Sequence, residues 1–271
     1  MSGRRRFRSS RRRWSVIERD LRRERGPLIA GVDEVGRGPL AGPVVACAVI
    51  MPPDARAIRG VDDSKALSAA ERIRLASLIR ARALAIGIGA ASVREIDRLN
   101  IYHASTLAMR RALGRLVMQP DHVLIDGKAI RTLPIPHTAV VHGDARCFSI
   151  ACASIVAKVT RDRLMRQLGE RYPAYRWGQN VGYATADHVA GLTAAGLTPH
   201  HRRSFLRPRQ LSLDLDAPVG LSVDATGAME VDVALVTDLA DVFQPCAPAS
   251  DEHAAPPPNE EPRAANLSRD A

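Results

Sequence analysis

The sequence predicts a mixed α/β domain in which one β-sheet is flanked by helices. Short apolar segments rich in β-branched residues alternate with longer segments of helical spacing, and the first two strands follow one another closely, as in a hairpin. At 271 residues and 46% hydrophobic composition, the chain can bury one substantial core. We expect a small helical part at the C-terminal end of this domain.

The first two strands are expected at residues 28–33 and 43–50. The second is a continuous apolar run with several β-branched residues, which is typical of a strand buried on both faces. A glycine-rich turn, Gly36-Arg37-Gly38-Pro39, lies between the two strands. Glycines permit backbone conformations that other residues avoid, so the chain can depart here from regular strand geometry.

Two capping boxes mark helix starts further along the chain. Ser68 with Glu71 predicts a helix to about Arg82, and Ser92 with Glu95 repeats the signal. The other expected elements are strands at 84–91, 122–125 and 138–141, and helices at 102–117, 149–170 and 185–195. Strands and helices therefore alternate through the central part of the chain.

Charge is distributed unevenly along the sequence. Residues 1–26 hold eleven arginines and three acidic residues, whereas residues 210–271 hold twelve acidic residues and two arginines. We expect a basic, disordered arm over 1–26, a folded domain over 27–209 and an acidic, mostly disordered tail over 210–271, because both ends offer little to bury. The basic central part suggests a polyanionic partner such as nucleic acid, and an arginine-rich solvated surface is the alternative.

The cysteines and the apolar runs exclude several classes of protein. Cys47, Cys147, Cys152 and Cys246 have neither paired CxxC spacing nor the ligand spacing of a zinc site, so reduced thiols are expected. The longest apolar run, at 40–50, is too short to span a bilayer. Charged residues follow the N-terminal arginines where an export signal would be apolar. We therefore expect a cytoplasmic protein without membrane association.

Four carboxylates stand where a structural role is hard to supply. Asp33 and Glu34 lie in an otherwise apolar first strand, and Asp126 and Asp144 follow two later strands. Buried acids are unfavourable unless paired or metal-bound, and acids without histidine or cysteine suit Mg²⁺ or Mn²⁺. Two such ions can activate a water and stabilise the leaving oxygen in phosphodiester cleavage. The alternative is a set of ordinary strand-end acids that make turns and caps.

Asp33 and Glu34 present a geometric difficulty, because adjacent residues of a regular strand point to opposite faces. A β-bulge or the end of the strand at this position would bring both into one site. The following glycines, spaced Gly36-x-Gly38-x-x-x-Gly42, match neither a P-loop nor a dinucleotide-binding fingerprint. A nucleotide cofactor is therefore disfavoured.

The segment from Asp33 to Pro43, DEVGRGPLAGP, resembles the opening signature of bacterial ribonuclease HII, within the type 2 ribonuclease H family. Further blocks resemble the family in the same order: Asp63-Ser64-Lys65, Leu124-Ile125-Asp126-Gly127, Gly143-Asp144, residues 149–162, residues 182–185 and residues 201–205. The resemblance covers about residues 27–206. It departs at Val35, where the family usually has Ala, and at Ala184, where Gly or Pro is commoner; neither change removes a functional group.

This resemblance implies a ribonuclease H-like fold and an endonuclease acting on nucleic acid that contains ribonucleotides. The implied activity is hydrolysis of the RNA strand of RNA–DNA hybrids and incision 5′ to single ribonucleotides in duplex DNA, giving 5′-phosphate and 3′-hydroxyl ends. Ribonucleotide excision and RNA primer removal would be its roles. A monomer that uses a divalent metal, Mn²⁺ or Mg²⁺, is expected.

The resemblance also assigns residues to that activity. Asp33, Glu34, Asp126 and Asp144 would be the catalytic, metal-binding carboxylates. Gly36, Arg37, Gly38 and Tyr183 would recognise the junction between a ribonucleotide and the following deoxyribonucleotide. The implied phosphate contacts are Ser64, Lys65, Lys158 and Arg161.

Two other functions remain open at this point. One is a different nuclease of ribonuclease H-like architecture, such as a resolvase or an integrase, because acid-and-metal chemistry is shared between them. The other is a noncatalytic nucleic-acid-binding protein that uses only its basic surface. Carboxylates in a phosphate-binding groove oppose binding unless metals neutralise them, so the four acids disfavour the second alternative.

Overall fold

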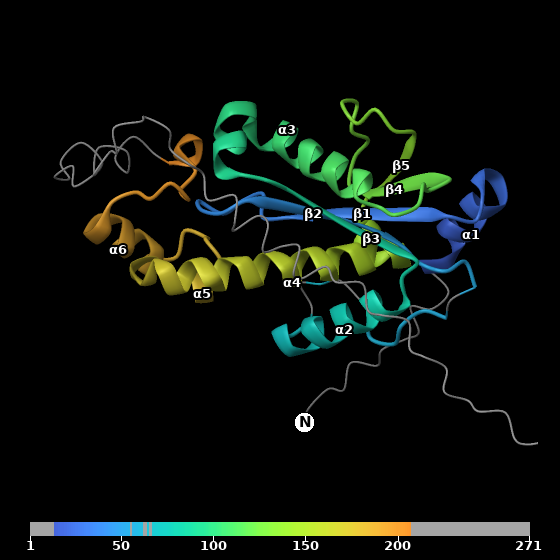
Figure 1. Ribbon diagram of the computed structural model, residues 1–271, viewed down its shortest axis with the longest axis horizontal. Helices are drawn as coiled ribbons and strands as arrows, with labels where there is room; N and C mark the ends of the chain where they lie inside the picture. Colours follow the sequence, from blue (N-terminus) through green and yellow to red (C-terminus); the bar gives the residue numbers. More distant parts are fainter. Residues whose placement is uncertain (1–13, 55, 62–63, 65–66, 207–271) are drawn as a thin grey trace, which may run out of the picture. The chain divides into compact units, whose positions relative to one another are not determined.

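The computed structural model describes residues 14–54, 56–61, 64 and 67–206, all within one compact unit of the chain. Five strands form one sheet in the order β3-β2-β1-β4-β5 (Figure 1). The strands are β1 (Ile29–Val35), β2 (Val44–Ile50), β3 (Ala85–Ala91), β4 (His122–Asp126) and β5 (His137–Val140). β2 is antiparallel to β1 and β3, whereas β4 is parallel to β1 and β5. The predicted mixed sheet is confirmed.

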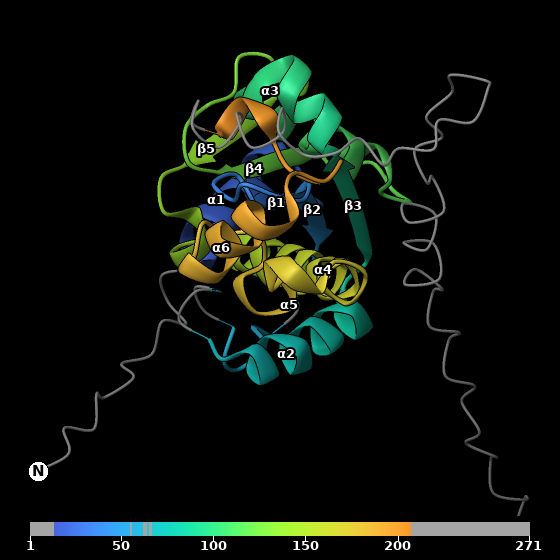
Figure 2. The same cartoon turned by 90° about the vertical axis from the view of Figure 1, so that its left-hand side faces the viewer.

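Helices cover both faces of this sheet. The helices are α1 (Trp14–Arg25), α2 (Ala69–Arg82), α3 (Val93–Gly114), α4 (Phe148–Arg171), α5 (Trp177–Asn180) and α6 (Ala186–Ala195). α3 packs on one face and the long helix α4 on the other, with α2 on the outer side of α4 (Figures 1 and 2). None of the helices in the described part of the chain is long and apolar enough to cross a membrane.

Both capping boxes form as the sequence predicts. Ser68 and Ser92 each accept the amide of the glutamate three residues on, and each glutamate accepts the amide of its serine. The second box opens α3 at Val93, and this helix continues through the one that the sequence places at 102–117. Asn100 interrupts it with a φ of 66° and its Oδ1 accepts the amides of Tyr102 and His103, so residue 102 starts the second half of a kinked helix.

The two helical layers approach the sheet very closely. Ala30 and Val32 of β1 belong to the apolar core beneath α3, and the alternating residues Ile29 and Gly31 face α4. A Cβ built on Gly31 would lie 2.2 Å from the carbonyl carbon of Ser149. α4 can therefore lie against β1 because position 31 carries no side chain.

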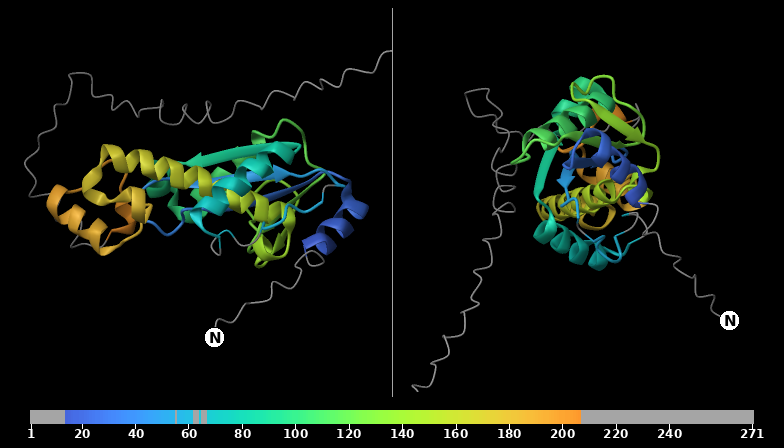
Figure 3. Two further views of the ribbon diagram at one scale, coloured as in Figure 1. Left: turned by 90° about the horizontal axis from the view of Figure 1, so that it is seen from below. Right: turned by 90° about the vertical axis from the view of Figure 1, so that its right-hand side faces the viewer.

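The expectation of a disordered arm over residues 1–26 is wrong for its second half, because Trp14–Arg25 form α1. Ile17 and Leu21 pack against the core at one end of the sheet, and the left panel of Figure 3 shows α1 at that end. Glu18 of this helix is buried and accepts hydrogen bonds from the amides of Phe148 and Ser149. The prediction of disorder was based on net charge and overlooked these three inward-facing residues. Residues 1–13 and the predicted tail at 210–271 lie outside the described residues.

The predicted small helical part follows α4. It consists of η3 (Pro173–Tyr175), α5, α6 and η4 (Arg203–Phe205). Tyr175, Trp177, His188 and His201 form its aromatic centre, with the rings of Tyr175 and Trp177 stacked at a centroid distance of 5.0 Å. α5 and α6 lie at the C-terminal end of α4 (Figure 1).

Candidate active site

The predicted carboxylates gather at the carboxyl ends of β1 and β4. The parallel register pairs Val32 with Ile125, so Asp33 and Asp126 are the next residues on neighbouring strands. Both follow residues that face α3, so both side chains point toward the α4 side of the sheet. Asp144 lies in η2 (Gly143–Ala145), immediately before α4, and is 9% exposed.

Asp33 is the most deeply buried of these acids. Its carboxylate accepts the amide of Glu34, at 2.8 Å, and a hydrogen bond from Ser154 of α4. Burial raises the pKa of Asp33 well above its usual value, and the charges of Glu34 and Asp126 raise it further. Three carboxylates therefore interact electrostatically at this edge of the sheet.

Hydrogen bonds tie Asp126 and Asp144 to the same short segment. Asp126 Oδ1 accepts the amide of Gly143 at 2.7 Å, and Asp144 Oδ1 accepts the amide of Ala145 at 2.9 Å. The first bond joins the end of β4 to η2, seventeen residues later. The side chain of one predicted catalytic residue thus fixes the backbone that carries another.

The expected bulge at Asp33 and Glu34 is absent. β1 keeps regular register with β2 through both residues, with Asp33 opposite Cys47 and Glu34 opposite Ala46. The alternative, a strand end, applies only to the edge of β1 that faces β4, because the pairing of β1 with β4 ends at Val32. Glu34 therefore starts from the opposite face to Asp33, and its Oε1 forms an ion pair with Arg37 at 3.1 Å.

The chemistry of the four side chains suits a divalent cation. All are oxygen donors, and burial raises the pKa values of Asp33 and Glu34, so a positive ion would relieve their repulsion. Within the described residues, their oxygens do not converge into a group of three or more ligands. Arg37 and the Gly143 amide hold Glu34 and Asp126 in their present hydrogen bonds.

Ser64 does not have the surface position that a phosphate contact requires. It is 5% exposed, and its hydroxyl lies 2.9 Å from that of Ser154. Because Ser154 also bonds to Asp33, the two serines form a short polar chain behind the carboxylate. Ser154 was not predicted as a site residue, although a serine on the otherwise apolar side of α4 was a usable signal.

Arg161 also differs from its predicted role as a phosphate contact. Its side chain is fully buried, and its guanidinium donates to the carbonyls of Ala41, Pro43 and Val181 at 2.9–3.1 Å. A Cβ built on Gly36, whose φ is 91°, would lie 2.1 Å from Nε of Arg161. Arg161 therefore supports the glycine-rich turn from inside the protein.

Tyr183 and the glycine-rich turn are adjacent, as a shared recognition site requires. A Cβ built on Gly38 would lie 3.7 Å from Cε1 of Tyr183, whose side chain is exposed at the surface. The carbonyl of Gly182 accepts the amides of Leu40 and Ala41, which fixes the tyrosine segment against the turn. The predicted residues Gly36, Arg37, Gly38 and Tyr183 thus lie together.

A chain of buried hydrogen bonds holds the backbone of Tyr183. The amide of Thr198 donates to Nδ1 of His201, which leaves Nε2 of this neutral ring to donate to Nε2 of His188 at 3.1 Å. Nδ1 of His188 then donates to the Tyr183 carbonyl at 2.9 Å. Burial, and then the neighbouring His188, lower the pKa of His201 to about 3, in agreement with a neutral pair.

The remaining predicted phosphate contacts have different positions. Lys158 on α4 is half-buried, and its Nζ forms an ion pair with Asp162 at 2.7 Å. Lys65 lies outside the described residues. A contact of either lysine with phosphate stays a prediction.

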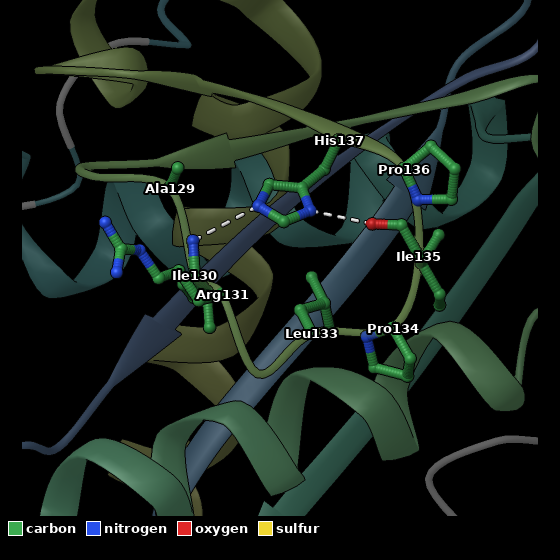
Figure 4. Close-up of a pocket in the computed structure, with 8 residues that line it drawn as sticks. All are labelled: Ala129, Ile130, Arg131, Leu133, Pro134, Ile135, Pro136 and His137. Carbon is green, nitrogen blue, oxygen red and sulfur yellow. Dashed lines mark hydrogen bonds between the residues drawn. The ribbon is translucent and has the colours of Figure 1, made fainter.

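A pocket of about 470 Å³ opens elsewhere, beside the loop between β4 and β5 (Figure 4). Eight residues of this loop line it, from Ala129 to His137. Nε2 of His137 accepts the amide of Ile130, so its Nδ1 donates to the carbonyl of Ile135. These bonds close the loop upon itself. None of the four carboxylates lines this pocket, which separates it from the candidate active site.

Comparisons with known proteins point to one family. The family model for ribonuclease HII matches residues 30–209. Ribonuclease HII of Granulibacter bethesdensis is 56% identical over 207 residues, covering 75% of this chain and 94% of the relative. Ribonuclease HII of Thermosynechococcus vestitus is 57% identical over 180 residues, covering 66% of this chain and 84% of the relative.

Solved structures support the fold. Ribonuclease H2 from Pyrococcus horikoshii OT3 superposes with a TM-score of 0.59 at 24% identity, covering 69% of this chain and 97% of that one. Bst-RNase HIII in complex with Mn²⁺ superposes with a TM-score of 0.53 at 19% identity, covering 69% of each chain. With the family match spanning most of the described domain, the chain belongs to the ribonuclease HII family of endoribonucleases.

Proposed function

We propose that this chain hydrolyses the RNA strand of RNA–DNA hybrids and also incises 5′ to single ribonucleotides in duplex DNA, leaving 5′-phosphate and 3′-hydroxyl ends. Family membership supports the ribonuclease H activity on hybrids. The observation that carries the finer proposal is the closeness of Gly38 to Tyr183: a Cβ built on Gly38 would lie 3.7 Å from the ring of this exposed tyrosine. The turn that holds Gly38 begins two residues after Glu34, so Val35 alone separates this carboxylate from the first residue of the turn.

The carboxylates Asp33, Glu34, Asp126 and Asp144 would hold divalent metal, Mn²⁺ or Mg²⁺. Bound there, such ions would supply an activated water and stabilise the leaving oxygen. The protein keeps these acids in a partly dry edge of the sheet, where charges interact more strongly than in water. Ser154 positions the Asp33 carboxylate, and Gly143 positions that of Asp126.

Recognition of the ribose would use the backbone of the turn and the ring of Tyr183. The 2′-hydroxyl is the group that separates RNA from DNA, and it can both donate and accept a hydrogen bond. Arg37 and Gly38 are exposed residues, and neither amide has a backbone acceptor in the described part of the chain, so both could bond such a group. The tyrosine ring offers a flat apolar surface to the sugar or base next to it.

The other expectations stay predictions. Lys65 and Lys158 would position the duplex through its phosphates, which adds affinity without reading sequence. A role in ribonucleotide excision and primer removal follows from the proposed substrates. The protein would act in the cytoplasm as a monomer.

One assay tests the proposed function. A DNA duplex with a single ribonucleotide, an RNA–DNA hybrid and an all-DNA duplex are incubated with the protein and Mg²⁺ or Mn²⁺, or with a chelator. Metal-dependent nicking 5′ to the ribonucleotide, absent on all-DNA, is the expected result. Cutting of the hybrid alone would remove the single-ribonucleotide activity, and equal cutting of all-DNA would indicate a nuclease of another kind.

A further inference from the structure

Two fully buried arginines lie behind the glycine-rich turn. Arg161 belongs to α4, and Arg202 lies just before η4. Arg202 donates to the carbonyls of Gly36, Arg37 and Gly42 at 2.6–2.9 Å. Arg161 binds the segment that follows the turn, through the carbonyls of Ala41 and Pro43. Among the described residues, neither guanidinium has a carboxylate at salt-bridge distance.

A buried cation without a counter-ion is unfavourable, so this arrangement needs a reason. An apolar side chain would fill the same space without the desolvation penalty. A lysine would carry the same charge but present it from one point, whereas the planar fork of an arginine reaches several acceptors at once. The distinctive contribution of Arg202 is therefore the direction it gives to three backbone carbonyls.

That direction determines where the amides of the turn point. The carbonyl and the amide of one trans peptide unit point in opposite directions, and none of the described peptide bonds is cis. With the Gly36 and Arg37 carbonyls turned inward to Arg202, the next amides, those of Arg37 and Gly38, point outward. Within the described part of the chain, neither amide has an acceptor.

The outward amides lie at the candidate recognition surface. Arg37 and Gly38 are exposed, and Gly38 lies beside the ring of Tyr183. The backbone around Arg202 also holds the segment that follows the turn. The amide of Gly42 donates to the carbonyl of His200, and the amide of Arg202 donates to the carbonyl of Leu40. The guanidinium itself is held in place by the ring of Phe205, 5.1 Å away.

We infer that Arg202 is a positioning residue for ribonucleotide selectivity: it turns the Gly36 and Arg37 carbonyls inward and so aims two amides at the ribose 2′-hydroxyl. This inference rests on the proposed function, since it assumes that the turn meets the ribose. It concerns only the discrimination between ribose and deoxyribose. Other charged residues provide the general affinity for a duplex.

The test is a binding measurement in an inactive background. Asp126→Asn protein binds a duplex with one ribonucleotide and the same all-DNA duplex, and the ratio of the two dissociation constants gives the selectivity. Adding Arg202→Lys keeps the charge and removes the fork. We expect the selectivity to fall about tenfold, as for the loss of one or two well-placed hydrogen bonds, with all-DNA affinity unchanged.

Arg161→Lys is the matched control, because it is equally buried and also binds three carbonyls, but not those of Gly36 and Arg37. It should reduce stability to a similar degree and reduce the selectivity clearly less than Arg202→Lys does. Phe205→Leu is a milder variant that leaves the fork in place and loosens it, and it should reduce selectivity less than Arg202→Lys. If Arg202→Lys does not fold, this variant decides.

The outcomes separate the two proposals. The inference is overturned if the parent protein is selective and Arg202→Lys keeps that selectivity. Where Arg202→Lys does not fold, the same result with Phe205→Leu overturns it. Either result leaves the proposed function standing. Equal loss in Arg161→Lys would also overturn it, since any disturbance of the turn would then suffice. Equal binding of both duplexes by the Asp126→Asn parent, together with a wild-type protein that cuts neither duplex, would remove the proposed function itself.

Discussion

Oδ1 of Asp126 accepts the amide of Gly143 at 2.7 Å, which joins the end of β4 to the turn that carries Asp144. A Cβ built on Gly143 would lie 3.2 Å from that oxygen and 2.7 Å from Cδ1 of Ile150. A side chain at position 143 would therefore require the side chains of Ile150 and Asp126 to shift. Asp126 has a structural role as well as its proposed catalytic one, and different substitutions separate them.

Asp126→Asn should abolish cleavage while keeping the fold. The asparagine retains an oxygen that can accept the Gly143 amide but loses the negative charge that a cation needs. Asp126→Ala should lose both, with a further loss of about 1–2 kcal/mol in the free energy of unfolding. Cleavage assays and chemical denaturation of the two variants measure this. Equal stability of both variants would show that the hydrogen bond contributes nothing.

Asp33→Asn should inactivate the protein and stabilise its metal-free form. Burial, and then the charges of Glu34 and Asp126, raise the pKa of Asp33 above its ordinary value of 3.8. Between this ordinary pKa and the higher pKa of Asp33 in the folded protein, the native state binds more protons than the unfolded state. The free energy of unfolding therefore falls as the pH rises through that window. The variant removes this slope. We expect a higher melting temperature at neutral pH, by about 2–4 °C for each kcal/mol of relieved repulsion.

The measurement is thermal unfolding in a chelator, as a function of pH. Asp187→Asn is the control, because it removes an acid on the exposed surface of α6. Adding Mg²⁺ or Mn²⁺ should then stabilise the wild type more than Asp33→Asn, since a ligand that binds the folded state raises its stability. A melting temperature that Asp33→Asn leaves unchanged or lowers would contradict the repulsion.

Gly36→Ala should destabilise the protein by more than the backbone strain of a positive φ alone. Both Gly36 and Gly196 have positive φ, at 91° and 73°, but a Cβ on Gly196 meets no atom within 4 Å. With a ψ of −157°, Gly196 has a backbone conformation that is nearly restricted to glycine, so Gly196→Ala should cost about 1–3 kcal/mol of backbone strain. Gly36→Ala adds the collision with Arg161, worth about 1–3 kcal/mol more, and displaces the turn. Denaturation and single-ribonucleotide cleavage of the pair decide this; equal effects would rule out the collision.

Much of this fold follows from local patterns in the sequence. The capping boxes at Ser68 and Ser92 and the apolar run of β2 depend on neighbouring residues, so a single sequence displays them. Asp33 and Asp126 could be singled out because each lies at or near the end of an apolar strand, whereas their adjacency depends on the parallel pairing of β1 with β4. The rest depends on contacts between distant segments.

The buried arginines show why distant contacts escape a sequence reading. Arginines are mostly exposed, and a basic helix beside a proposed nucleic-acid site suggests phosphate binding. Nothing near Arg161 in the sequence reveals that Ala41 and Pro43, some 120 residues earlier, offer it carbonyls. Ser64 was misassigned for the same reason, since its partner is ninety residues away. Charged residues in α1 likewise concealed the one glutamate that is buried.

Glu18→Ala should destabilise the protein although α1 lies outside the catalytic sheet. The carboxylate is 2% exposed and accepts the amides of Phe148 and Ser149 and the hydroxyl of Ser149, so it caps α4 from 130 residues away. Removing it leaves these donors unpaired, and we expect a loss of about 2–4 kcal/mol. Glu24→Ala, on the exposed side of α1, is the control. Equal stability of the two variants would deny the cap.

Tyr183→Ala should weaken cleavage at single ribonucleotides and leave metal binding intact. The ring is 47% exposed beside Gly38, whereas the carboxylates belong to other segments, so its loss removes a surface for the substrate only. A loss of at least about tenfold in kcat/KM is expected for one stacked aromatic contact. Tyr183→Phe keeps the ring and loses the hydroxyl, so it separates stacking from hydrogen bonding. Metal affinity, followed by the thermal shift, should match the wild type in both. Unchanged junction cleavage in Tyr183→Ala would reject the role of this residue, and a changed metal affinity would mean that the ring supports the carboxylates instead.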